Sequence, residues 1–190
     1  MDATTETRER WTIDDLEALA QEEGKRYEII EGDLSATTQP HWFHQVTCAL
    51  IAPELVQWSR ADGHGAVSVA PGVIFDSDNA VAPDVVWISS ERLARVLDKD
   101  GKLHEAPDLA VEVLSPGTIN TRRDRQAKLR LYSLRGVREY WIVDWEARSL
   151  QVYRREAGAL KLAMTLFPDD ELNSPLLPGF AVPVARLLPG

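Results

Sequence analysis

The sequence predicts one mixed α/β domain of ordinary globular composition. Its 190 residues suffice for a single hydrophobic core and hardly for two. Strand-like residues 108–114, helical residues 121–134 and strand-like residues 140–143 follow one another, an order that builds a sheet covered by helices. We therefore expect one domain at residues 11–190, preceded by a polar and charged N-terminus at residues 1–10 that is disordered or flexible.

The chain is expected to begin with a helix and a pair of strands. Thr12 followed by Asp15 resembles a capping box and predicts a short helix that runs to Ala20. Residues 25–31 have the composition of a strand that enters a turn at Gly32, after which a second strand is expected.

One long helix and three short strands are expected next. Apolar side chains recur at helical spacing in residues 41–60, but Pro53 lies inside this pattern and should kink or interrupt the helix. Residues 67–69 and 73–75 predict a strand pair or one irregular strand, and residues 85–88 predict another strand.

The second half contains the strongest strand of the sequence. Residues 108–114 (DLAVEVL) place Leu109, Val111 and Val113 on one face and Glu112 on the other. Gly136 should end the helix that follows. The remaining expectations are an exposed helix at 89–104, an antiparallel meander of strands at 140–143, 150–153 and 160–166, and an extended surface tail from Ser174 onward.

Composition limits the compartment and the kind of nucleic-acid contact. The N-terminus lacks the apolar core of a signal peptide, no apolar run is long enough to cross a bilayer, and the one cysteine is incompatible with an intrachain disulfide framework. We therefore expect a cytoplasmic protein without a membrane partner. The net charge of −9 argues against non-specific coating of nucleic acid.

A basic segment nevertheless interrupts this acidic chain. Residues 122–138 contain seven basic residues and one acid, and they include Arg122, Arg123 and Arg125. Such a local positive strip is compatible with a phosphate substrate held at one place. It is equally compatible with a solvated helix face, which is the commoner meaning of a charge run.

Two acids stand beside strongly apolar strands. Glu112 lies inside DLAVEVL, and Asp84 immediately precedes Val85–Ile88. Taken singly, Glu112 on a half-exposed strand and Asp84 as a turn residue are the commoner cases. On adjacent strands, however, the two carboxylates could meet at one point and offer hard oxygen ligands to Mg²⁺.

Further charged residues could complete such a site. Glu28 is a third acid in an apolar strand-like segment, although a surface strand explains it about as well, and Glu31 falls on the opposite face. Lys128 is the candidate cation, because it follows Asp124 by four residues on the helix after the Glu112 strand. On spacing alone, an exposed Asp–Lys helix pair is the commoner case.

Histidine, cysteine and tryptophan carry weaker signals. His41 and His44 are three residues apart but lack a third neutral ligand at a characteristic spacing. His44 and Cys48 share a helix face, yet a cysteine among apolar neighbours is usually a small core residue. The six tryptophans are scattered, which favours packing roles over a base-stacking platform.

Several fragments occur in a characteristic order: YEIIEG (27–32), APDVVWIS (82–89), PDLAVEVLSPGT (107–118), Asp124 with Lys128 and Tyr132, GVREYWIVD (136–144) and LLPGFAV (176–182). Together they resemble the Uma-two family of endonucleases, which belongs to the PD-(D/E)XK superfamily. This resemblance implies a restriction-endonuclease-like core, in which a mixed central β-sheet is flanked by α-helices. It also implies Asp84 and Glu112 as the metal-binding pair, with Glu28 as an additional active-site acid.

The sequence departs from the superfamily pattern at one position. The motif lysine should lie two residues after Glu112, where this chain has Leu114. In related nucleases this lysine can come from the neighbouring helix, where Lys128 stands. The departure leaves open a nucleic-acid-binding module of the same fold that cuts weakly or not at all. The net charge of −9 leaves open a protein-interaction domain, and a metal-dependent hydrolase of another anionic substrate is a third alternative.

The mechanism that the resemblance implies is metal-assisted phosphodiester hydrolysis, with DNA as the expected substrate. Asp84 and Glu112 would bind Mg²⁺, for which Mn²⁺ could substitute, and the Val113 carbonyl would complete the ligand set. Glu28 would position a metal or water, and Lys128 would orient the nucleophile or neutralise charge. The arginines from Arg122 onward would contact phosphates. Cleavage of both strands of a duplex by a one-site enzyme favours a homodimer.

Overall fold

The structure is a computed structural model that describes residues 10–19, 25–37, 39–62, 64–115 and 119–190, without the side chains of 17–19, 62 and 119–124. Most of the expected flexible N-terminus therefore lies outside the described residues. Arg10 is the exception, since its guanidinium lies 2.5 Å from a carboxylate oxygen of Asp78.

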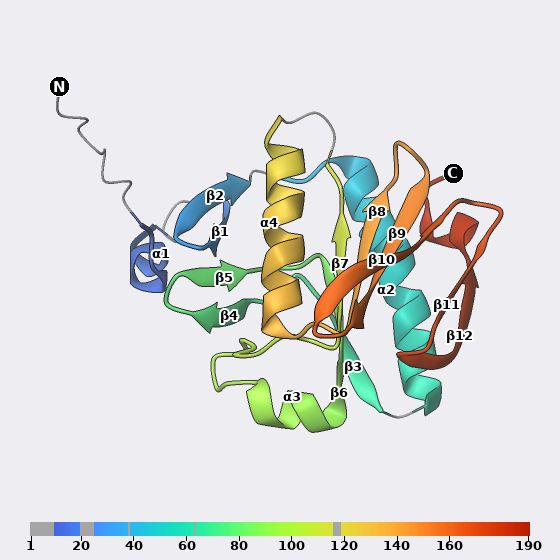
Figure 1. Ribbon diagram of the computed structural model, residues 1–190, viewed down its shortest axis with the longest axis horizontal. Coiled ribbons are helices and arrows are strands. Elements are labelled where there is room, and N and C mark those ends of the chain that lie inside the picture. The colour runs from blue at the N-terminus through green and yellow to red at the C-terminus, as the bar shows by residue number, and fades with distance from the viewer. Residues whose placement is uncertain (1–9, 20–24, 38, 63, 116–118) are drawn as a thin grey trace.

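A six-stranded mixed sheet forms the centre of the fold (Figure 1). Its strand order is β10-β9-β8-β7-β6-β3. The strands are β3 (Gly65–Val69), β6 (Val85–Ser89), β7 (Leu109–Val113), β8 (Glu139–Asp144), β9 (Ser149–Glu156) and β10 (Ala159–Leu166). β7 and β8 are parallel, and the other neighbours are antiparallel. The mixed central sheet and the β8–β9–β10 meander are thus confirmed.

Two long helices cover the two faces of this sheet. α2 (Trp42–Asp62) contributes Ile51 and Leu55 to a core that also contains Val111, whereas α4 (Ile119–Arg135) contributes Leu131 to a second core with Ala110. Because neighbouring residues of a strand point to opposite faces, the alternation expected for β7 is confirmed. Figure 1 shows α4 in front of β7 and α2 behind the sheet.

A smaller antiparallel sheet lies beside α4, in the order β2-β1-β5-β4 (Figure 1). Its strands are β1 (Arg26–Ile30), β2 (Asp33–Thr37), β4 (Val73–Asp76) and β5 (Asn79–Val81). The expected pairing of residues 67–69 with 73–75 is wrong, because β3 and β4 belong to different sheets. Ala70 has a φ of 50°, so the chain turns sharply between the two strands.

The expected helix at 41–60 is present as α2, and Pro53 lies inside it without interrupting it. Its exposed position allows the carbonyl that it leaves without a partner to face solvent. The helix expected at 89–104 is shorter, because α3 (Ser90–Val96) ends where Leu97 adopts extended backbone. Leu103 then enters the core and bridges to Val73.

The sequence predicted the first helix correctly but not the structure of the C-terminal residues. The predicted helix start is confirmed at α1 (Ile13–Leu19), where the backbone N–H and the hydroxyl of Thr12 both donate to Asp15 Oδ2 at 2.8 Å, which is one half of a capping box. The expected surface tail is instead a hairpin of β11 (Glu171–Ser174) and β12 (Leu177–Pro183), followed by the 3₁₀ helix η1 (Val184–Leu187). Leu177 and Phe180 are buried in the α2-side core. None of the described helices is long and apolar enough to span a membrane.

Candidate metal and catalytic site

Asp84 and Glu112 meet at one edge of the central sheet. Asp84 directly precedes β6, and Glu112 lies near the end of β7, which runs antiparallel to β6. The start of one strand therefore lies beside the end of the other. The backbone N–H of Val113 donates to Asp84 Oδ2 at 2.8 Å and fixes that carboxylate against β7.

Glu28 and Lys128 join this edge from two other elements. Glu28 on β1 accepts a hydrogen bond from the backbone N–H of Ala82 at 2.8 Å. Lys128 on α4 places its Nζ 2.9 Å from Glu28 Oε2 and 3.0 Å from Glu112 Oε2. Figure 1 shows α4 between the small sheet and β7, the position from which a helix can bridge the two acids. The four predicted catalytic residues are thus brought together, while their roles stay predictions.

Tyr132 and His44 also hold the carboxylates, although the sequence did not assign them a role. Tyr132 lies one turn after Lys128 on α4 and donates its hydroxyl to Glu112 Oε1 at 2.8 Å. His44 on α2 places Nε2 3.2 Å from Asp84 Oδ2. The signal for Tyr132 was its helical spacing from Lys128, and the signal for His44 was its face shared with Cys48.

Helical spacing predicts a packed stripe of Ala127, Leu131 and Leu134 on α4. Leu131 is buried as predicted, but Leu134 is 73% exposed, whereas Lys128 and Tyr132 are only 8% and 0% exposed. Spacing alone favoured an exposed Asp–Lys pair, but Lys128 is buried. Burial of the lysine and tyrosine is supported by the acids that meet them.

The acids and the lysine shift one another's pKa values. Burial raises the pKa of Glu112 to about 8; the Lys128 ammonium opposes this rise, and the charges of Asp84 and Glu28 add to it. Burial alone would lower the pKa of Lys128, but Glu112 and Glu28 hold it well above its usual value. Lys128 therefore stays charged at neutral pH.

The effects on the pKa of Asp84 combine in the opposite direction. Burial acts to raise its pKa, but the hydrogen bond and charge of His44 and the Val113 amide hold that pKa below its usual value. Arg26 at the rim adds a guanidinium 3.5 Å from Asp84 Oδ1. Three buried carboxyl groups thus face one buried ammonium and one guanidinium at the rim. A bound cation would offset the repulsion among the acids that helps to raise the pKa of Glu112.

The donors fit the expected magnesium ion in chemistry. Asp84 and Glu112 offer carboxylate oxygens, which are the hard ligands that Mg²⁺ prefers. The Glu112 oxygens contact Lys128 and Tyr132. Asp84 also belongs to a second cluster of possible metal ligands. Among the described residues, the ligand atoms of His44, Cys48 and Asp84 all lie within 4.8 Å of one another.

The remaining predicted residues are placed as follows. Arg122 and Arg123 lie on α4, and their side chains are outside the described residues. Arg125 donates a hydrogen bond to Gln151 on β9. Leu114, at the position of the motif lysine, packs against the α4-side core, and its carbonyl accepts the indole N–H of Trp145 at 3.0 Å.

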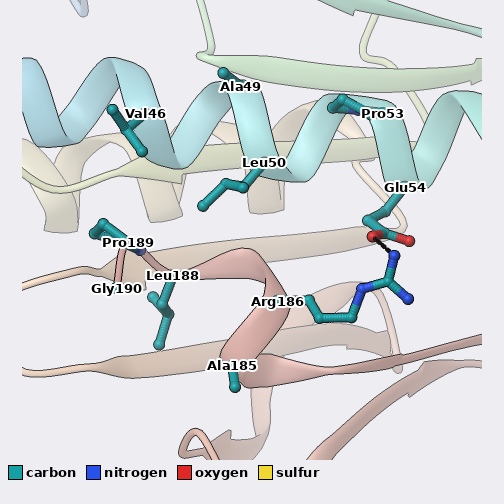
Figure 2. A pocket seen from close by; sticks show the side chains of 10 residues that line it. All are labelled: Val46, Ala49, Leu50, Pro53, Glu54, Ala185, Arg186, Leu188, Pro189 and Gly190. Atoms are coloured by element: carbon teal, nitrogen blue, oxygen red, sulfur yellow. Dashed lines mark ion pairs between the residues drawn. The ribbon is translucent and has the colours of Figure 1, made fainter.

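A shallow hollow lies on the opposite side of α2 and has no part in this site. It measures about 550 Å³ and separates α2 from η1 and the last residues of the chain (Figure 2). Apolar side chains such as Val46 and Leu50 line it, and Glu54 pairs with Arg186 across it at 2.6 Å. The acids described above lie on the other face of the helix, beyond His44 and Cys48.

Comparison with known proteins gives this geometry a family. Residues 13–185 match Uma2, a family described as "Putative restriction endonuclease". The chain belongs to the Uma2 family. It also superposes on the crystal structure of a "putative nuclease belonging to DUF820" from Anabaena variabilis ATCC 29413, with a TM-score of 0.74 and 19% sequence identity. That match covers 93% of this chain and 96% of the other and shows the same fold. No curated protein matches the sequence.

Proposed function

We propose that this Uma2 protein is a Mg²⁺-dependent endonuclease that hydrolyses phosphodiester bonds of nucleic acid, with DNA as its expected substrate. The observation that carries the proposal is the meeting of Glu28, Asp84 and Glu112 around Lys128 at one sheet edge. Burial of three acids is costly unless they are paired or bind a cation. The family to which the chain belongs supports a nuclease over other metal-dependent hydrolases.

Each residue has a separate role in the proposed reaction. Asp84 and Glu112 would hold the cation, together with the Val113 carbonyl. When bound, Mg²⁺ or Mn²⁺ supplies Lewis-acid chemistry to the phosphate and to a water. Glu28 would orient the attacking water or a cation ligand, and the Lys128 ammonium would neutralise charge that develops on the phosphate.

The basic residues of α4 supply the proposed contact with the nucleic-acid backbone. Arg122 and Arg123 begin the basic segment on α4, the helix that also carries Lys128. Arg125 lies three residues before Lys128 on the same helix. Phosphate contacts of this kind position a substrate without reading its sequence. Binding should therefore weaken steeply as salt rises. We further propose that two copies act together when both strands of a duplex are cut.

The test is nicking of supercoiled plasmid DNA with Mg²⁺, with Mn²⁺ and with chelator alone. Wild type should nick in either metal, and Asp84→Asn and Glu112→Gln should each lose at least about 100-fold in rate. Both variants keep the size of the native side chain, so loss of folding is easily separated by circular dichroism. Glu54→Gln, on the opposite face of α2, is the matched control and should cut at the wild-type rate.

The outcome also decides between the nuclease and the alternative raised by Leu114. Metal-independent, salt-sensitive DNA binding without any nicking would show a binding module that has kept the fold and lost cleavage. Cleavage that survives in both Asp84→Asn and Glu112→Gln would refute the site assignment. Absence of both binding and cleavage would refute the proposed nuclease and leave a protein-interaction domain or a metal-dependent hydrolase of another anionic substrate.

A further inference from the structure

α2 brings a histidine and a cysteine against an acid of the proposed magnesium site. His44 and Cys48 are one helical turn apart on the face that meets the start of β6. Cys48 Sγ lies 3.8 Å from His44 Nδ1, and His44 Nε2 lies 3.2 Å from Asp84 Oδ2. The three side chains are buried, and their ligand atoms all lie within 4.8 Å of one another.

We propose that His44, Cys48 and Asp84 form a second metal site, which takes a borderline or soft divalent cation such as Zn²⁺ and shares Asp84 with the magnesium site. The zinc site stands on its own geometry. Only the sharing of Asp84 rests on the proposed function.

The donor types select zinc over magnesium. Imidazole nitrogen and thiolate sulfur are common zinc ligands, whereas Mg²⁺ is held by oxygen. Metal–ligand bonds of about 2.0–2.3 Å at tetrahedral angles place donor atoms roughly 3.3–3.8 Å apart. The distances of 3.2 Å to Asp84 and 3.8 Å to Cys48 run to different nitrogens of the His44 ring. With one nitrogen as the donor, the three ligand atoms lie within 4.8 Å of one another, so a modest contraction brings them to this geometry. Three protein ligands would leave a fourth position for water, as in open zinc sites.

Binding requires two local changes. One ring nitrogen must face both partners, so the His44 ring has to rotate slightly from its present bridging position. The thiol must also lose its proton. Burial, with the charges of Asp84 and Glu112, raises the pKa of Cys48 to about 12 in the absence of metal. A coordinated divalent cation reverses that effect, and one proton passes to solvent as the metal–sulfur bond forms.

The consequence for the proposed nuclease is inhibition by zinc. A cation on His44 and Cys48 would occupy the Asp84 carboxylate, which the proposed magnesium site needs. Zn²⁺ should therefore suppress cleavage, and added Mg²⁺ should relieve the suppression by competition for Asp84. The same chain would then respond in opposite ways to a hard and a soft divalent cation.

The decisive experiment is titration of the untagged, metal-stripped full chain with Co²⁺ as a spectroscopic substitute for zinc. Cys48 is the one cysteine of the sequence, so a thiolate-to-cobalt charge-transfer band can come from no other residue. We expect that band to saturate at one Co²⁺ per chain and to disappear when Zn²⁺ is added. Absence of the band in folded wild type overturns the proposal.

Variants assign the other two ligands. Cys48→Ser should abolish the band, and His44→Ala and Asp84→Asn should each weaken Co²⁺ binding by at least about tenfold. His104→Gln is the matched control, because this histidine pairs with Asp98 on the surface, and its band should equal that of wild type. A band of undiminished affinity in His44→Ala would refute the three-residue site.

Inhibition is measured separately, so that the two proposals can fail independently. Zinc inhibition of plasmid nicking is compared between wild type and Cys48→Ser, each normalised to its own rate in Mg²⁺. We expect at least a tenfold higher zinc concentration for half-inhibition in Cys48→Ser. Equal inhibition would overturn the sharing of Asp84. If wild type cuts nothing, the proposed function fails, and the cobalt titration still decides the metal site.

Discussion

The two ends of the β7–β8 strand pair both bury acids, but they satisfy those acids differently. At the amino end lie Asp108 and Glu139, each 1% exposed. At the carboxyl end lies Glu112, 8% exposed, with Asp84 and Glu28 nearby. The comparison teaches that burial of a carboxylate alone does not mark a functional site.

At the amino end, Asp108 has a hydrogen-bond donor and two cations close to its carboxylate. Asp108 accepts the backbone N–H of Ser89 at 2.9 Å and lies 3.6 Å from Arg92 and 3.4 Å from Arg138. Two guanidinium groups thus serve one carboxylate. This arrangement stabilises the fold and leaves no surplus negative charge for a cation.

Glu139 follows the same rule. It accepts the indole N–H of Trp141 at 2.7 Å, the guanidinium of Arg154 at 3.1 Å and the hydroxyl of Ser174 at 3.0 Å. The two amino-end acids are thus served by three guanidinium groups, those of Arg92, Arg138 and Arg154. At the carboxyl end, by contrast, three acids have the Lys128 ammonium and the Arg26 guanidinium at the rim. The ratio of acids to cations is therefore what separates a structural end from a candidate catalytic end.

The largest expected effect is that of Lys128→Met, which removes the shared ammonium. Glu28 and Glu112 would then face each other without a cation, which should cost about 3 kcal/mol in the free energy of unfolding. Urea denaturation with and without Mg²⁺ measures this. Metal should restore more stability to the variant than it gives to wild type, and an unchanged stability in chelator would contradict the charge-ratio argument.

Glu139→Ala should destabilise the protein by about 2–3 kcal/mol, because it strands the Trp141 indole and the Ser174 hydroxyl without their acceptor. The rate of plasmid nicking per folded molecule should not change. Thermal unfolding and nicking of the same preparation provide the measurement. A large loss of cleavage in well-folded Glu139→Ala would show that the amino end takes part in function.

Magnesium should stabilise wild type in proportion to its affinity. At a concentration 100 times its Kd, it should add about 2.7 kcal/mol to the free energy of unfolding. Asp84→Asn should lose most of this gain, whereas Asp108→Asn, its counterpart at the amino end, should keep it. Equal magnesium stabilisation in both variants would place the cation elsewhere.

The smallest expected effect is that of Tyr132→Phe. It removes one hydrogen bond to Glu112 and should cost about 1 kcal/mol of stability. Nicking should fall by only a few-fold, since Lys128 still contacts the same carboxylate. A loss as large as that of Glu112→Gln would mean that the tyrosine hydroxyl itself acts on the substrate.

Local signals in the sequence predicted the site better than they predicted its surroundings. The alternation in β7 placed Glu112 on the face opposite Val111 and Val113, because it depends on short-range periodicity. Spacing along α4 alone favoured an exposed Lys128, and the order of the family's fragments pointed this residue to the site. The burial of Leu177 and Phe180 depends on which part of the central sheet α2 leaves uncovered, and no local pattern encodes that. Contacts of His44 with Asp84 likewise need the packing of α2 on β6.

The parallel pairing of β7 with β8 has a consequence for how the chain folds. Parallel neighbours require a crossover that carries the chain back over one face of the sheet to the start of the next strand, and here that crossover contains α4 and its Lys128. Unpaired burial of the Glu112 carboxylate is costly, so the two strands can settle together with Glu112 charged only after the crossover has docked. Register of the sheet and assembly of the polar edge are therefore a single cooperative event, and a chain that misplaces the crossover cannot complete either one.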